Sequence, residues 1–152
     1  MNGSEDNERA PGDSAEQRHA EGLLIQNFCQ QEGLDLQRNK RVFLGGRAWF
    51  ELDGFCENPL IFCEAWAHQG PPKSAQTKKI MGDAFKLIFA EKHFGKNARK
   101  ILLFADERAS KPFRGNSWMA AALQNFGIET IVVELSQDVR NVLLKAQHRQ
   151  FR

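Results

Sequence analysis

Alternating apolar and polar positions predict three consecutive strands in the first half of the chain. The first begins near residue 41 and ends at the glycine pair 45–46, the second covers about residues 47–55, and the third covers about residues 60–67. The connections are short, and the last one contains the turn dipeptide Asn58-Pro59. We therefore expect an antiparallel three-strand meander.

Four segments with apolar residues at helical spacing predict helices at about residues 15–31, 73–94, 117–126 and 137–149. Glycines 33, 95 and 127 lie where the first three should end. The expected inner side of the first helix consists of Leu23, Leu24, Asn27, Phe28 and Gln31. The expected apolar stripe of the second consists of Ile80, Met81, Ala84, Phe85, Leu87 and Ile88.

Two nearly continuous apolar runs, at about residues 100–105 and 128–135, predict strands that are buried on both faces. Each is reached through a helix, so both should be parallel crossover strands. Residues 106–116 between them are polar and are expected to form a loop. The predicted class is α/β, with a mixed central sheet and helices on both faces.

Length and composition are those of one soluble globular domain, which we place at residues 16–152 of the 152-residue chain. Residues 1–15 are polar, contain Gly and Pro, and predict a disordered tail. No apolar run approaches the roughly 18 residues of a membrane span, and the N-terminus lacks the apolar region of a secretory signal. The formal charge of +2 neither suggests nor excludes a nucleic-acid partner.

The cysteines predict a reducing, cytoplasmic environment. Cys29, Cys56 and Cys63 are odd in number and show no CxxC spacing, as expected for buried thiols of a cytosolic protein. The four histidines do not pair with cysteines at the spacing of zinc ligands, so we do not expect a zinc site.

Two carboxylates interrupt the apolar second and third strands. If the turn is symmetric about residues 58–59, Asp53 lies opposite Glu64 with Cβ atoms roughly 5 Å apart, where like charges destabilise a sheet. Mg²⁺ or Mn²⁺ would offset the two charges, because Mg²⁺ takes one or two carboxylates together with water and substrate phosphate. The simpler interpretations are an Asp-Gly turn at Asp53 and a surface acid at Glu64.

The order helix, three-strand meander, helix, strand, with these two acids, resembles the PD-(D/E)xK nuclease superfamily and its restriction-endonuclease-like fold. The match covers about residues 18–106 and rests on Glu51-Leu52-Asp53-Gly54 and Glu64-Ala65-Trp66, with the last helix, strand and helix as an extension. The resemblance implies a metal-dependent nuclease that hydrolyses phosphodiester bonds of DNA, with Asp53 and Glu64 as its Mg²⁺ or Mn²⁺ ligands.

The chain departs from the family at Trp66, which stands where the motif lysine should be. Some branches of the superfamily carry this lysine on the following helix, so the resemblance implies Lys73 and Lys79 as catalytic candidates. Gln76 would then position the attacking water or a phosphate. The simpler interpretation of all three residues is a solvated helix face.

Three further residues are accessory candidates. Glu21, on the first helix, is expected to contribute through a water molecule. Trp66 is either a core or cleft wall or a base-stacking platform. His68 follows the third strand, where it either contacts substrate or has a structural role.

The loop after the strand at residues 100–105 is a candidate nucleic-acid contact. It combines Arg108, Lys111 and Arg114 with Phe113, and cations beside an aromatic ring suit phosphate contact and base stacking. It also follows the carboxyl end of a central strand, where open α/β sheets bind ligands. The alternative is an ordinary solvated loop.

Two other functional classes remain open. Loss of the motif lysine at Trp66 favours a catalytically impaired nuclease-fold module that binds nucleic acid or a partner protein. A nucleotide-binding α/β domain is disfavoured because the chain has no GxGxxG or GxxxxGK loop. The chain has little room for a separate recognition domain, so specific DNA binding would require a homodimer or a partner subunit.

Overall fold

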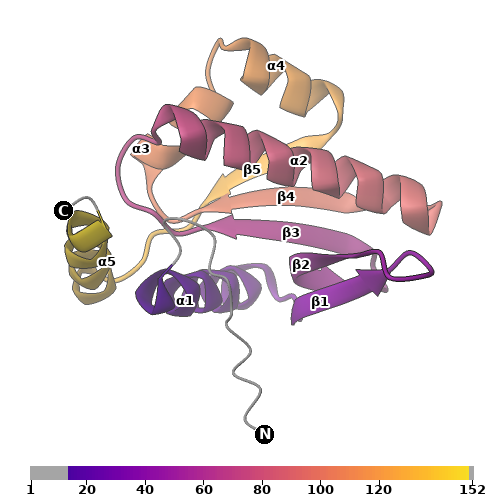
Figure 1. Ribbon diagram of the computed structural model, residues 1–152, viewed down its shortest axis with the longest axis horizontal. Coiled ribbons are helices and arrows are strands. Elements are labelled where there is room, and N and C mark those ends of the chain that lie inside the picture. Colours follow the sequence, from indigo (N-terminus) through magenta and orange to yellow (C-terminus); the bar gives the residue numbers. More distant parts are fainter. Residues whose placement is uncertain (1–13, 151–152) are drawn as a thin grey trace, which may run out of the picture.

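The computed structural model describes residues 14–150 as a five-stranded mixed sheet with helices on both faces (Figure 1). Most of the predicted tail at residues 1–15 lies outside the described residues. Its last two residues, Ser14 and Ala15, belong to the first helix: the Ser14 side chain accepts a hydrogen bond from the Gln17 N–H at 3.1 Å, and the helix begins at Ala15.

The strands lie in the sheet in the same order as in the chain. They are β1 (Gln37–Phe43), β2 (Trp49–Cys56), β3 (Ile61–Trp66), β4 (Arg99–Phe104) and β5 (Ile128–Val132). The first three are antiparallel to one another, whereas β4 is parallel to β3 and β5 is parallel to β4. The predicted meander, crossover strands and α/β class are confirmed.

Helices cover both faces of this sheet (Figure 1). They are α1 (Ala15–Glu32), α2 (Ser74–Phe94), α3 (Glu107–Ser110), the short 3-10 helix η1 (Lys111–Phe113), α4 (Trp118–Asn125) and α5 (Gln137–Gln150). α1 lies on one face and α2 and α4 lie on the other, while α5 packs against α1 beyond the carboxyl ends of the strands. No helix of residues 14–150 is long and apolar enough to cross a membrane.

Each face of the sheet has its own core because successive strand residues point to opposite sides. On the α1 side the buried residues include Leu24, Ile25, Phe28, Cys63, Ile101, Leu103 and Leu143. On the α2 side they include Leu52, Phe62, Trp66, Ile80, Leu87, Leu102 and Phe104. Burial of each large side chain contributes roughly 1.5–3 kcal/mol, so both layers stabilise β3 and β4, the central strands.

Several sequence predictions of detail were wrong. β1 begins at Gln37, four residues early, because a half-exposed edge strand accepts polar residues that hide its periodicity. In α1, Gln31 is exposed and Ile25 is buried instead, so the inner face is rotated. In α2, Phe85 is 72% exposed. The predicted loop at residues 106–116 contains α3 and η1.

The alternation in β2 breaks at Asp53. β1 pairs with β2 through Arg38↔Gly54 and Lys40↔Leu52, and the intervening Asn39 has a left-handed φ of 54°. Leu52 and Phe55 both pack in the core on the α2 side. Strict alternation would place Phe55 on the face opposite Leu52, but the irregular pairing beside Asn39 shifts the alternation by one residue.

Candidate functional site

Asp53 and Glu64 face each other where the β2–β3 ladder ends. The observed pairs are Gly54↔Cys63, Phe55↔Phe62 and Cys56↔Ile61, and continuing this register by one residue places Asp53 opposite Glu64, as the turn predicted. Beyond Gly54 a side chain replaces the backbone pairing, because the Ala65 N–H donates to Asp53 Oδ2 at 2.9 Å. The two acids therefore lie at the point where the strands separate.

Glu64 lies in the interior of the protein. It is only 4% exposed, on a strand with neighbours on both sides, so the alternative interpretation of Glu64 as a surface acid was wrong. Burial raises the pKa of the Glu64 carboxyl group well above its ordinary value, and the negative charge of Asp53 raises it further. A buried carboxylate at this position requires a cation.

That cation is Lys86, a residue that sequence reasoning missed. Its ammonium nitrogen lies 2.5 Å from Glu64 Oε1, without the alignment of a regular hydrogen bond. Burial acts to lower the pKa of Lys86, but the carboxylates of Glu64, Asp83 and Asp53 outweigh it and the pKa is raised. Lys86 is therefore a charged group held against the acid pair.

Asp83 joins Lys86 to Lys79 along one face of α2. Lys79 Nζ lies 3.2 Å from Asp83 Oδ2, and Lys86 Nζ lies 3.9 Å from Asp83 Oδ1. Burial raises the pKa of Asp83 even though both lysines act to lower it. The spacing of residues 79, 83 and 86 is the helical signal that could have identified Lys86 from the sequence.

Lys79, a predicted catalytic candidate, lies near the acids. Burial acts to lower its pKa, but Asp83, Asp53 and the predicted accessory acid Glu21 outweigh it and the pKa is raised. The Lys79 ammonium group also lies 5.5 Å from the centre of the Trp66 ring. The fold thus brings Lys79 and Glu21 into the electrostatic neighbourhood of Asp53.

Lys73 and Gln76 have a different position. They lie at the start of α2, and Gln76 Oε1 accepts a hydrogen bond from the Lys73 backbone N–H at 2.9 Å. This contact caps the first turn of the helix. Gln76 is roughly 15 Å along the helix axis from Lys86, so it belongs to the helix end and does not face Glu64.

Trp66 and His68 form a buried stack beside the site. Trp66 is buried, which fits the predicted wall and not an open base-stacking platform. Its ring centre lies 4.3 Å from that of His68, whose Nδ1 lies 3.4 Å from the Gln17 amide nitrogen. Burial and, secondarily, the charge of Lys79 lower the pKa of His68 to about 4, so the ring is neutral at pH 7.

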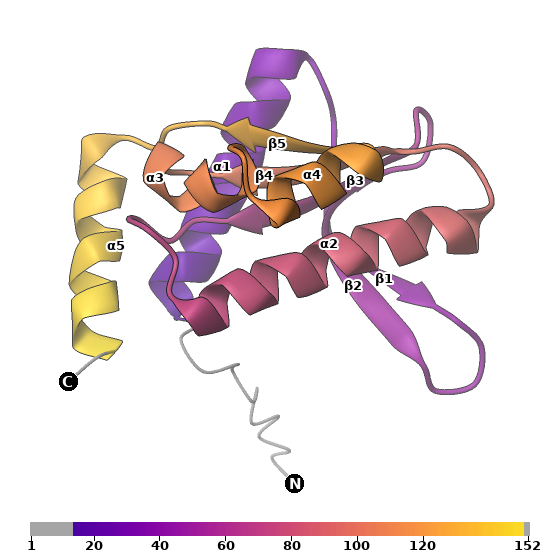
Figure 2. The same cartoon turned by 90° about the horizontal axis from the view of Figure 1, so that it is seen from above.

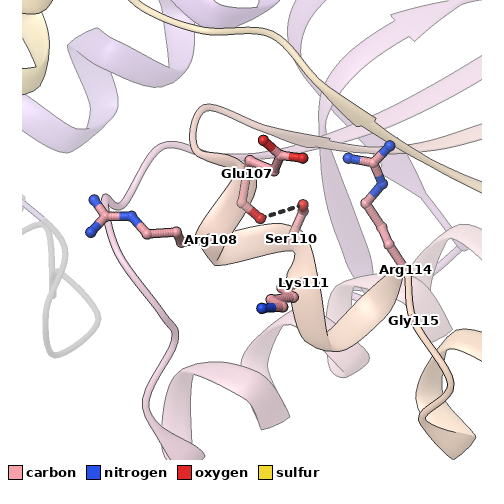
Figure 3. Close-up of a pocket in the computed structure, with 6 residues that line it drawn as sticks. All are labelled: Glu107, Arg108, Ser110, Lys111, Arg114 and Gly115. Carbon is pink, nitrogen blue, oxygen red and sulfur yellow. Dashed lines mark hydrogen bonds between the residues drawn. The ribbon is translucent and has the colours of Figure 1, made fainter.

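The predicted nucleic-acid loop forms a separate pocket of about 460 Å³, lined in part by Arg108, Lys111 and Arg114 (Figure 3). Arg108 and Arg114 extend to opposite sides of α3, and Arg108 binds Asp106 at 3.2 Å. Phe113 is 1% exposed and stacks on Phe104 within the core. The prediction that Phe113 is available for base stacking was wrong.

Comparison with known proteins adds no relative. No family model matches the chain, and neither the curated proteins nor the solved structures give a significant match to it.

Proposed function

We propose that the chain is a metal-dependent phosphodiesterase of restriction-endonuclease-like fold that acts on DNA. The observation that carries this proposal is the placement of Asp53 and Glu64 opposite each other where two strands separate, with Lys86 held against them. The observed order of helix, meander, helix and strand also agrees with the resemblance to the PD-(D/E)xK superfamily.

The donor set fits Mg²⁺ or Mn²⁺. Residues 14–150 contain no group of three or more His, Cys, Asp or Glu side chains that could enclose a metal, but Mg²⁺ needs only one or two carboxylates when water and phosphate complete its shell. Asp53, Glu64 and Asp83 also outnumber Lys79 and Lys86 by one charge. When bound, the metal would lower the pKa of a coordinated water and stabilise charge on the phosphate.

Lys86 takes the role that the resemblance assigned to a lysine of the following helix. Glu64 holds its ammonium group beside the acids, from where it can orient the attacking water or neutralise the phosphate. Lys79, whose side chain is half exposed, would contact the substrate from the same helix face. Lys111 and Arg114 are the loop cations that we propose bind the DNA backbone, with a homodimer or partner subunit supplying specificity.

Cleavage of labelled single-stranded and duplex DNA in the presence of Mg²⁺ or Mn²⁺ tests this proposal. Asp53→Asn, Glu64→Gln and Lys86→Met should each abolish metal-dependent cleavage. Lys92→Met changes an exposed lysine near the end of the same helix and should cleave like the wild type. Unchanged cleavage by the Asp53→Asn and Glu64→Gln variants would contradict a catalytic metal site at these two acids.

One observation favours a second function, a non-catalytic module that binds nucleic acid or a partner protein. The ion pair with Lys86 already compensates the charge of Glu64, so the fold does not need a metal there. In this case the wild type should bind DNA without divalent cations and cleave none in their presence.

A further inference from the structure

The β1–β2 hairpin carries an uncovered aromatic face. Phe43 and Trp49 are directly paired near its tip and are 67% and 48% exposed. The neighbouring residues Val42 and Phe50 point to the other side, where Phe50 contacts Phe89 of α2 at 5.7 Å between ring centres. The hairpin is therefore anchored through one face while the other presents two large rings.

No helix lies over this aromatic face in the described structure. α1, the helix on that side of the sheet, packs on β3, β4 and α5. Figure 2 shows the hairpin extending past α2 and away from α1. The two rings are thus placed at the periphery of the molecule and not over the core.

The hairpin that carries the two rings is rich in cations, and Arg41 lies against one of the rings. Residues 37–49 contain Arg38, Lys40, Arg41 and Arg47 and no acidic residue. The Arg41 guanidinium carbon lies 4.5 Å from the centre of the Trp49 ring, and its Nε lies 3.6 Å from Glu51. Arg47 is exposed in the connection at the tip.

We propose that this hairpin face binds single-stranded nucleic acid, with bases stacked on Trp49 and Phe43 and phosphates bound by Arg41 and Arg47. Exposed aromatic rings beside cations are the chemistry that holds unpaired bases, whereas a duplex keeps its base faces covered. A second copy of the chain fits less well, because its Arg41 and Arg47 would meet the same cations.

The hairpin site is separate from the acid pair. Trp49 precedes Asp53 by four residues on β2, about 13 Å along a strand, and lies on the face opposite the core that contains Phe50 and Leu52. The assignment of nucleic acid as the ligand class rests on the proposed function, although binding at the hairpin requires no cleavage.

Fluorescence anisotropy with a labelled oligothymidylate of about 20 nucleotides, in EDTA, tests this inference. Trp49→Ala should weaken binding about 5- to 100-fold, while Trp49→Phe keeps most of it. Arg47→Gln should reduce the slope of log affinity against log salt by about 0.7. Trp118→Ala removes an exposed ring of α4 and serves as the matched control, with unchanged binding.

Three results would overturn the inference: no binding by the wild type, wild-type affinity in Trp49→Ala, or an equal loss in Trp118→Ala. Binding of an oligouridylate of the same length should depend on Trp49 in the same way, because stacking on the ring does not distinguish ribose from deoxyribose. Binding that depends on Trp49 without any Mg²⁺-dependent cleavage would contradict only the proposed function. Cleavage with no effect of Trp49 on binding would contradict only the hairpin.

Discussion

Lys86 of α2 and Glu64 of β3 form an ion pair at 2.5 Å within the core between helix and sheet. The pair explains how a carboxylate is accommodated in a strand that is otherwise apolar. It also places a lysine of α2 beside two acids, whereas the third strand carries Trp66 where the resemblance would require a lysine.

Removing Lys86 should affect stability as well as activity. Lys86→Met leaves the buried Glu64 without its cation, so at pH 8 the free energy of unfolding should fall by about 1–3 kcal/mol. The double variant with Glu64→Gln should recover part of this loss, because neither charge is then unpaired. Urea unfolding of the wild type, the two single variants and the double variant measures the coupling energy between Glu64 and Lys86. Strictly additive effects of the two substitutions would contradict the ion pair.

Glu64→Gln should become more stabilising, relative to the wild type, as pH rises. The fold raises the pKa of Glu64, so its protonated form is favoured and ionisation above about pH 4.5 costs stability until the folded pKa is passed. Each unit by which the pKa is raised corresponds to about 1.4 kcal/mol. Unfolding free energies of both proteins at acidic and alkaline pH provide the comparison, and a difference that is constant with pH would argue against a buried, strained carboxylate.

His68 should produce the opposite pH dependence. The pKa of His68 in the fold is about 4, below the ordinary 6.5. Its contribution to the free energy of unfolding is therefore complete above pH 6.5 and is lost as pH falls towards 4. The stability advantage of the wild type over His68→Gln should shrink by about 3 kcal/mol over this interval. His148→Gln, at an exposed position of α5, should follow the wild type; if His68→Gln does the same, His68 is not buried as a neutral ring.

Gly22→Ala should impair the site without unfolding the protein. A Cβ atom at Gly22 would lie 2.6 Å from a guanidinium nitrogen of Arg38, whose Nε donates to the Asp53 carbonyl oxygen at 3.2 Å. Arg38 can swing away, and alanine favours a helix by about 1 kcal/mol over glycine, so thermal stability should change little. Metal-dependent cleavage should nevertheless fall several-fold, whereas cleavage equal to that of the wild type would show that Arg38 does not position Asp53.

The sheet and the acid pair were predictable because their signals are local. Alternation, glycine punctuation and the turn at Asn58-Pro59 were enough to predict the strand directions and to place Asp53 opposite Glu64. The observed β2–β3 register agrees with this prediction because the hairpin itself sets it, without contacts between residues far apart in the sequence.

The sequence did not identify Lys86 as the lysine beside the acids, because its position depends on how α2 is rotated over the sheet. Lys73 and Gln76 were favoured for their position near the start of the helix, and Lys79 because of the family resemblance. The helix approaches Glu64 of β3 further along, at Lys86. The burial of Phe113 likewise depends on the short helices after β4, which their polar sequence conceals.

Titration calorimetry of Mn²⁺ into the purified protein, alone and with an added oligonucleotide, shows whether Asp53 and Glu64 form a metal site. If Asp53 and Glu64 hold the metal, the wild type binds Mn²⁺, and Asp53→Ala and Glu64→Ala each lose that binding. Asp138→Ala, which removes an exposed carboxylate of α5, retains it. Absence of binding by the wild type under both conditions, or binding that survives in both site variants, would contradict a metal site between the two acids.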